Sequence, residues 1–293
     1  MDLKKFKLIS AVFLAGALLF LSVILMVNKN QADNLPYSVA EDLSALFAGR
    51  DVELSPDIIP LKRDKLPVYS CSTADGTQAQ IIAETIGNST RFAANLTEDG
   101  YLFRLASGAM IEVSRLREVK FDHNKINTGL ALSSPPTDSA KMMADAFIAR
   151  FTASLDGDDE KLCTYTLKGY ASQGSDTLLN FEISIDGIMI EGSGLSVRRN
   201  ESGDLLGAYG NCVFVPLKKE SGFKNYDIIN ILKREYDEIS ESGSPSSKIN
   251  SISSCYLIHS SADGKQILFL PAWKIVYSNG IVRFYESVLT ETY

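Results

Sequence analysis

The amino-acid sequence predicts an α+β protein in which an N-terminal transmembrane helix is followed by two extracytoplasmic domains of antiparallel sheets covered by helices. Three observations predict this fold class. An uncharged apolar run of 20 residues, Leu8–Val27, lies near the start of the chain. Amphipathic stretches with helical periodicity recur after it, and short alternating strands joined by Asp-Gly or Asn-Gly pairs follow them. Helices that cover one face of antiparallel sheets make an α+β fold.

The apolar run has the length that a helix needs to cross a hydrocarbon core of about 30 Å. Lys4, Lys5 and Lys7 precede it, and this charge bias places residues 1–7 in the cytoplasm and the rest of the chain outside the cell. No A-x-A-like cleavage site follows the run. We therefore expect a single-pass protein of the cell membrane in which residues 8–27 remain as a signal anchor.

Small residues lie on one face of this expected helix. Ala11, Ala15 and Ser22 are spaced i, i+4 and i+11, and small residues let another membrane helix approach closely. We interpret this strip as a partner contact. The alternative is ordinary composition, since alanine is common in membrane helices.

The first outer domain is expected over residues 35–133. Pro36 opens a helical pattern that stops at Gly49. Residues 54–67 hold three prolines, so this stretch cannot form a helix and is expected to be an extended connector. A second helix is expected at 75–86, with short strands after it. The hairpin turns expected between those strands are Asp99-Gly100 and Ser107-Gly108.

The second outer domain is expected over residues 137–293. Two prolines stiffen the stretch 133–136, which is the expected domain joint. Thr137 can cap a helix with an apolar repeat every four residues, and strands follow it. The pattern restarts with an amphipathic helix at 226–239 and three more strands. The expected hairpin turns of this domain are Asp186-Gly187, Asp263-Gly264 and Asn279-Gly280.

The composition excludes several classes of function. Acidic residues outnumber basic residues by 36 to 29, whereas a nucleic-acid-binding protein needs an excess of positive charge. His123 and His259 are the only histidines, which is little material for a metal centre. No motif of a hydrolase, zinc protease or nucleotide-binding loop is present. We predict no enzymatic activity, no cofactor and no small-molecule substrate, and we interpret Gly192-Ser193-Gly194 as a strand bulge.

The four cysteines, Cys71, Cys163, Cys212 and Cys255, are widely separated and form no C-x-x-C motif. Each lies in an apolar strand pattern, where a thiol packs as a small hydrophobe. Outside the membrane, disulfides are possible, and four cysteines allow three pairings, although we favour buried thiols. Cys163 and Cys212 are the best placed to meet, because they belong to the first and fourth strands of one repeat. Both states therefore stay open.

The segment from Leu268 to Ser287 is the most distinctive stretch. Pro271 within a strand pattern indicates an edge strand or a bulge. Trp273 is the single tryptophan of the chain. It has two interpretations, a core aromatic residue or a recognition ridge on an edge strand that contacts a partner.

These features resemble a known family. The basic amino terminus, the single membrane helix, the DIIPLKRDKLP stretch and the terminal hairpin PAWKIVYSNG-IVRFYES look like the YycI proteins of the YycH/YycI group. The resemblance implies an extracytoplasmic accessory protein that regulates a cell-wall-linked sensor histidine kinase of a two-component system. Its partners would be that kinase and a YycH-like protein, and it would have no enzymatic activity. The terminal hairpin is also similar to PepSY modules, but residues 286–290 depart from the turn that ends those modules.

Two functions follow from these resemblances. The first is regulation of a sensor histidine kinase by protein contact. The alternative is a PepSY-like inhibitor or modulator of a secreted or membrane protease, which needs an exposed edge strand that the protease can engage. A kinase or a peptidase encoded beside this chain would distinguish the two.

Overall fold

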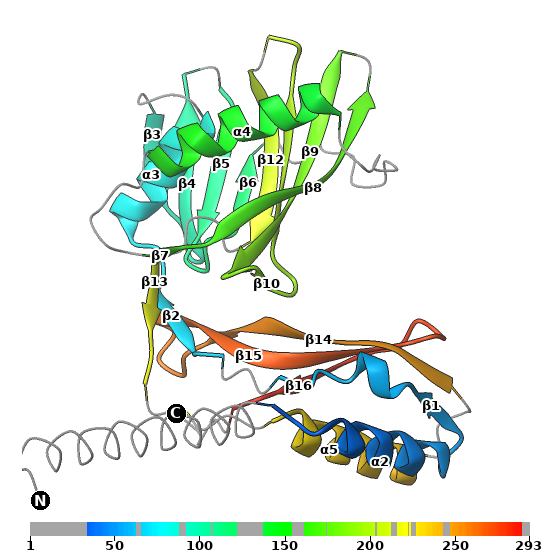
Figure 1. Cartoon of the computed structure of the whole chain (residues 1–293). Helices are drawn as coiled ribbons and strands as arrows, with labels where there is room; N and C mark the ends of the chain where they lie inside the picture. Colours follow the sequence, from blue (N-terminus) through cyan, green and yellow to red (C-terminus); the bar gives the residue numbers. More distant parts are fainter. Residues whose placement is uncertain are drawn as a thin grey trace, which may run out of the picture. The chain divides into compact units, whose positions relative to one another are not determined.

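The computed structural model is a mixed α+β protein (Figure 1). It describes residues 34–62, 66–87, 92–106, 108–121, 137–153, 161–173, 175–202, 204–211, 216–221, 223, 227–242 and 247–288. Within these ranges, no helix is both long enough and apolar enough to cross a membrane. The expected span 8–27, with Ala11, Ala15 and Ser22, lies outside the described residues. Cys212, His123 and the expected joint 133–136 lie outside them as well.

The chain forms two compact units, and neither is continuous in sequence. Unit 1 combines the residues up to Leu66 with Asn225–Ser253 and Trp273–Ser287. Unit 2 combines Pro67–Lys224 with Ser254–Ala272 and the residues from Val288 onward. This grouping differs from the consecutive domains 35–133 and 137–293 that the sequence predicts.

Pairings between distant strands cause the difference. In unit 1, strand β1 (Val52–Leu54) pairs in parallel with β14 (Ser247–Ser260). In unit 2, β2 (Tyr69–Ser72) pairs antiparallel with β15 (Gln266–Tyr277), and β13 (Pro216–Lys219) pairs with β2 and with β7 (Lys161–Leu162). Strands β14 and β15 are each divided between the two units, after Ser253 and after Ala272 respectively. No local pattern in the sequence signals these contacts.

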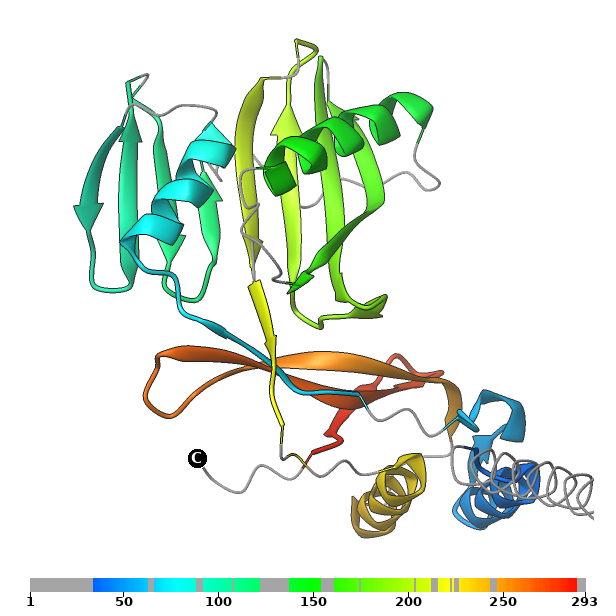
Figure 2. The same ribbon diagram turned by 60° about the vertical axis from the view of Figure 1, so that its left-hand side comes forward.

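Unit 1 packs two helices, α2 (Tyr37–Ala48) and α5 (Ile228–Ser242), side by side against strands that include β16 (Val282–Glu286) (Figures 1 and 2). Phe47 of α2 meets Tyr236 of α5 edge to face, with ring centroids 5.8 Å apart. The expected helices are therefore confirmed. Within the connector expected to lack a helix, Pro56–Ile58 forms a single 3₁₀ turn, which tolerates proline in its first position.

Unit 2 is built on a nine-stranded antiparallel sheet in the order β10-β9-β11-β12-β6-β5-β4-β3, with β8 also paired to β9. The strands not yet given bounds are β3 (Phe92–Leu96), β4 (Gly100–Leu105), β5 (Met110–Ser114), β6 (Val119–Phe121), β8 (Thr164–Gln173), β9 (Asp176–Ile185), β10 (Ile188–Met189), β11 (Gly194–Arg199) and β12 (Leu205–Asn211). The β6–β12 pairing joins strands that the sequence assigns to separate domains.

Helices α3 (Gly76–Gly87) and α4 (Asp138–Ala153) cover one face of this sheet (Figure 2). Asp75 caps α3 by accepting the Gln78 N–H at 2.8 Å, and Thr137 caps α4 as expected. Alternate residues of the strands build the core beneath the helices, because successive side chains point to opposite faces. One buried row across the sheet is Phe103, Ile111, Phe121, Ala208, Val197 and Leu179.

The predicted hairpin turns at Asp186-Gly187, Asp263-Gly264 and Asn279-Gly280 are confirmed. The turn predicted at Asp99-Gly100 is shifted by one residue, because the Thr97 N–H donates to the Gly100 carbonyl and Gly100 is the first residue of β4. Asp186 and Gly187 have φ angles of 53° and 79°, the left-handed conformation that the tightest hairpins require. Gly264 and Gly280 also have positive φ. Gly100 serves a different purpose. A Cβ atom there would lie 2.3 Å from the Val113 carbonyl oxygen, so only glycine allows β4 to approach β5 so closely.

Candidate interaction surface

A groove of about 740 Å³ lies at the turn end of strands β4, β5 and β6 in unit 2. It is lined by the β3–β4 turn, the β5–β6 turn, the strand ends beside them and Gly264 of the β14–β15 turn. Backbone hydrogen bonds hold the two principal turns together, since the Arg115 N–H donates to the Asp99 carbonyl at 3.0 Å. Arg117, with φ of 61°, takes the left-handed conformation that closes the second turn.

The groove is mainly acidic. Four carboxylates line it, those of Glu98, Asp99, Glu112 and Glu118, against the two cations Arg115 and Lys120. The Lys120 ammonium lies 3.4 Å from the Glu118 carboxylate, so these two charges form an ion pair within the groove. A cationic group of a partner is the complement that this arrangement favours.

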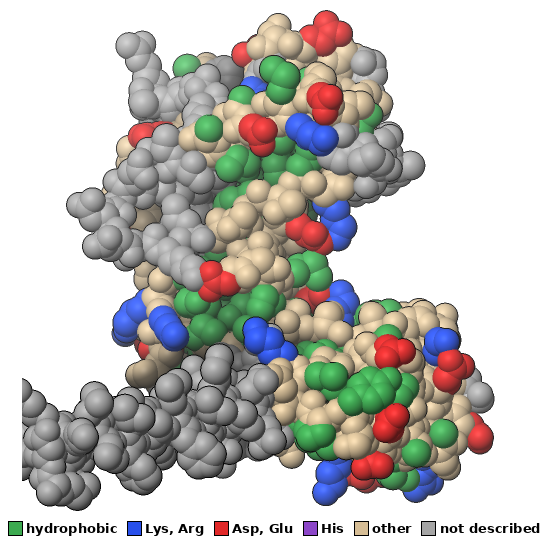
Figure 3. Space-filling model, in the orientation of Figure 1, with side chains coloured by type: hydrophobic (Ala, Val, Ile, Leu, Met, Phe, Trp, Pro, Cys, Tyr) green, Lys and Arg blue, Asp and Glu red, His purple; other side chains and the backbone are tan. Residues whose placement is uncertain are grey.

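A polar row crosses the sheet face opposite the helices, and part of it lines the groove. Its members follow directly from the strand registers and alternate with the buried row: Glu112, Lys120, Tyr209, Ser196 and Asn180, with the apolar Leu102 beside Glu112 at one end. Tyr209 is 37% exposed. Glu112 is exposed as well, and no helix of the described residues packs on this face. Figure 3 shows the other side of unit 2, where α4 covers the sheet, and charged side chains of both signs lie among apolar ones there.

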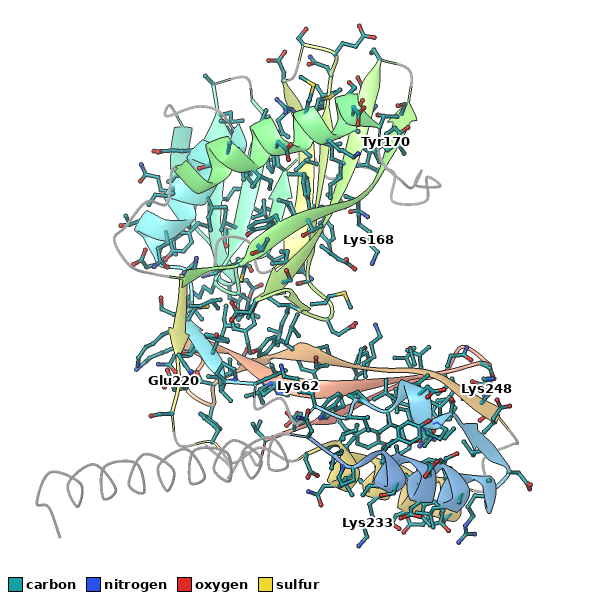
Figure 4. All side chains as sticks on the ribbon, in the orientation of Figure 1. Lys62, Lys168, Tyr170, Glu220, Lys233 and Lys248 are labelled. Carbon is teal, nitrogen blue, oxygen red and sulfur yellow. The ribbon has the colours of Figure 1, made fainter. Side chains whose placement is uncertain are left out.

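The two edges of the nine-stranded sheet are built differently. Edge strand β8 has an irregular register between Leu167 and Gly169, and Lys168 at this bulge pairs with Glu182 (Figure 4). Bulges and lysines are devices that prevent an edge from pairing with another chain. Edge strand β3 keeps an unbroken register with β4 along its whole length. Its sequence, FAANL, contains no charge and no proline.

The β5–β6 turn also contains a buried arginine, which lies near a buried cysteine. Arg117 is 2% exposed, and its guanidinium donates to the Gln78 side-chain oxygen at 2.8 Å and to the Ser72 carbonyl at 3.3 Å. Burial raises the pKa of the Cys71 thiol to about 11, although the nearby Arg117 opposes this rise. Cys71 is therefore protonated at neutral pH, which argues against a nucleophilic role. Cys163 and Cys255 are also buried and outside any disulfide.

Unit 1 contains a buried carboxylate. Glu235 of α5 has no exposed surface and accepts hydrogen bonds from the hydroxyl groups of Tyr277 and Tyr285 and, at 3.1 Å, from Arg283. The Tyr285 hydroxyl also lies 2.8 Å from a Glu238 carboxylate oxygen, so its single proton is shared between the two carboxylates. Burial, followed by hydrogen bonding to Glu235, raises the pKa of both tyrosines well above the usual range, so they remain donors. This cluster joins α5 to β15 and β16.

Sequence reasoning missed the partners of Glu235, although a signal existed. Arg283 and Tyr285 alternate along one strand and therefore share a face. An arginine and a tyrosine on the helix-facing side of a strand indicate a buried acidic partner, since buried charges are paired.

The structure also decides between the interpretations of Trp273. Its side chain is 7% exposed and packs in the core of unit 1 with Ile275 and Tyr277. Trp273 is thus a core aromatic residue, and its expected role as a surface contact is wrong. Pro271 does not lie on an edge strand, because β15 pairs with β2 through residues 266–269 and with β16 as well.

The remaining predicted features have simple structural roles. Ser193 lies in a turn before β11, where its hydroxyl donates to the Ile190 carbonyl at 2.7 Å. It is therefore a turn residue and not part of a strand bulge. Among the residues that the structure describes, no three His, Cys, Asp or Glu side chains are grouped to hold a metal ion.

The chain has distant likenesses among solved structures. No protein-family model matches the chain, and no curated protein matches its sequence. An uncharacterized protein from Eubacterium rectale is similar in structure, with a TM-score of 0.45 and 10% sequence identity. The match covers 78% of this chain and 86% of that chain.

Proposed function

We propose that this chain is a membrane-anchored extracytoplasmic accessory protein that regulates a cell-wall-linked sensor histidine kinase by protein contact, as the resemblance to YycI implies. The observation that carries the proposal is the surface of unit 2. An acidic groove, a polar sheet face and an uncovered strand edge are features that recognise other proteins. A YycH-like protein would be the second partner.

The sequence supports the location of this contact. Leu8–Val27 would place the chain in the same membrane as a sensor kinase, with the groove on the outer side. Tethering both proteins to one membrane raises their effective concentration, so a weak contact suffices for regulation.

Co-purification of the kinase with the full chain tests the proposal. Glu112 is exposed in the groove, and Glu112→Lys reverses its charge. We expect about fivefold less kinase to co-purify, corresponding to roughly 1 kcal/mol for a charge at an interface rim. The matched control is Glu41→Lys on the exposed side of α2 in unit 1, which should change nothing. If the unchanged chain, Glu112→Lys and Glu41→Lys all recovered equal amounts of kinase, the groove would not be part of the kinase contact.

A second candidate is the PepSY-like modulation of a protease. The observation that favours it is strand β3, because this function needs an exposed edge strand. The same co-purification separates the candidates, since a peptidase would be recovered in place of a histidine kinase.

A further inference from the structure

The backbone of edge strand β3 presents hydrogen-bonding groups to its open side. The Thr97 N–H donates to the Gly100 carbonyl at 2.8 Å, which makes this a bonded pair of the β3–β4 ladder. Bonded and non-bonded pairs alternate along an antiparallel ladder. Asn95 therefore bonds to β4, whereas the N–H and C=O groups of Ala94 and Leu96 point away from the sheet.

These outward groups are accessible. Every side chain from Ala93 to Asp99 is exposed, and Leu96 is 70% exposed. An uncharged edge of this kind is a hazard for aggregation, which proteins ordinarily counter. The opposite edge of the same sheet has a bulge with a lysine, Lys168, whereas β3 has neither a bulge nor a charged residue.

The charge around β3 indicates what it binds. The strand itself is uncharged, but Glu98 and Asp99 follow directly in the turn and lie at the mouth of the acidic groove. A matching segment would be uncharged along β3 and would carry lysine or arginine at the end that meets this turn. A second copy of the chain is the competing occupant, because Arg91 directly precedes Phe92–Leu96 in the sequence and an antiparallel pair brings the amino-terminal end of one strand beside the carboxyl end of the other. Sedimentation of the chain distinguishes that occupant from a segment of a partner protein.

We propose that β3 binds an extended segment of a partner protein as an added antiparallel strand, with basic residues at the amino-terminal end of that segment. In an antiparallel pair, the amino terminus of the added strand lies beside the carboxyl end of β3 and so beside Glu98 and Asp99. Backbone bonds to Ala94 and Leu96 would supply affinity, and the acidic turn would set direction. This inference rests on the proposed function only in taking the partner to be a protein.

Two synthetic peptides test the proposal by fluorescence anisotropy with the full chain in nonionic detergent. The first has two lysines followed by six alternating threonines and valines, and the second has the same six residues followed by the two lysines. We expect the lysine-first peptide to bind about tenfold more tightly than the lysine-last peptide, since only its charges meet the acidic turn. Glu98→Gln with Asp99→Asn should abolish this preference and its salt dependence.

A backbone variant tests strand addition itself. Ala94→Pro removes an outward N–H and leaves the bonds between β3 and β4, a position where an edge strand tolerates proline. It should weaken binding of the lysine-first peptide about tenfold. Ala94→Thr keeps the N–H at the same site and should bind within about twofold of the unchanged chain. Circular dichroism should show the same unfolding transition for both variants.

Several results would overturn the inference. These are no binding of the lysine-first peptide, equal binding of the two peptides, or equal binding by the proline and threonine variants. A dimer in sedimentation that Ala94→Pro abolishes would assign the edge to a second copy instead. None of these outcomes changes the kinase co-purification test, because that test measures the effect of Glu112 in the groove and does not depend on the edge of β3.

Discussion

Replacing Glu235 by alanine should destabilise unit 1 by about 3–5 kcal/mol, the range for removing one member of a buried charged network. The contacts show how this sum arises. Tyr277 would keep its hydroxyl buried with no carboxylate to accept its proton, at about 1–3 kcal/mol. The loss of free energy at Tyr285 and Arg283 would be smaller, because each still contacts the Glu238 carboxylate, at 2.8 Å and 3.5 Å respectively. The deleted side-chain volume adds about 1 kcal/mol.

Urea unfolding of the full chain in nonionic detergent, followed by tryptophan fluorescence, measures this change. Trp273 is the only tryptophan and lies in the same core as Tyr277 and Tyr285, so its emission reports unit 1. Glu235→Gln keeps an acceptor oxygen and should cost about 1–2 kcal/mol. The control is Glu238→Ala, three residues further along α5, because the Glu238 side chain is 43% exposed.

A double-mutant cycle checks the reasoning. Tyr277→Phe removes the hydroxyl that Glu235 leaves unsatisfied, so the double variant Glu235→Ala with Tyr277→Phe should lose about 1–2 kcal/mol less than the sum of the single losses. If Glu235→Ala cost under about 1 kcal/mol, or no more than Glu238→Ala, the cluster would not stabilise unit 1 as argued.

Three further predictions concern other parts of the chain. Gly100→Ala should lower the thermal unfolding temperature of unit 2, measured by circular dichroism, because its Cβ would meet the Val113 carbonyl at 2.3 Å; an unchanged melt would contradict this. Cys71 should resist alkylation at pH 8, as peptide mass mapping would show. Because its pKa is raised from 9.0 to about 11, its stabilising contribution is complete below pH 9 and is lost as the pH rises toward 11. Ala11→Leu with Ala15→Leu should preserve membrane insertion but reduce kinase co-purification, since close helix approach is blocked; unchanged recovery would leave the helix as an anchor only.

The sequence predicts the local elements of this fold well, because each depends on nearby residues. The helix expected at 75–86 is found at Gly76–Gly87, and the one expected at 226–239 is found at Ile228–Ser242. Apolar periodicity and a capping residue, Asp75 for α3, determine such elements locally.

The grouping into units could not be predicted in the same way. Leu54 meets Ile249 in a parallel pair, and nothing in either short strand identifies the other, since many apolar stretches would serve. The burial of Trp273 and Glu235 has the same origin, because both depend on which strands are brought together. The candidate groove was missed for a related reason. Its acidic residues lie in two separate turns that become neighbours only when β4, β5 and β6 pair.

The discontinuous units lead to a final prediction about truncation. A chain that ends after Ser221 keeps every strand of the nine-stranded sheet, both helices that cover it, and its main core, which lies between Ala79 and Ala208. It loses α5, β14, β15 and β16, which supply most of the core against which α2 packs. A short helix is marginal in water without such packing, so α2 should become protease-sensitive.

Limited proteolysis with mass mapping should therefore show cleavage within residues 37–48 and protection of strands β3, β4, β5, β9, β11 and β12, with the strand signal in circular dichroism retained. The full chain, digested in parallel, should be protected in both regions. Rapid digestion within these strands in the truncated chain would mean that the sheet needs the carboxyl-terminal strands. Protection of residues 37–48 would mean that α2 is stabilised by something other than the core of unit 1. Cleavage confined to residues 37–48 would establish that the two units differ in how their cores are assembled. Unit 2 has most of its core within one stretch of chain. The core of unit 1 instead joins residues from both ends of the chain, and such distant contacts form only after the last strands are present.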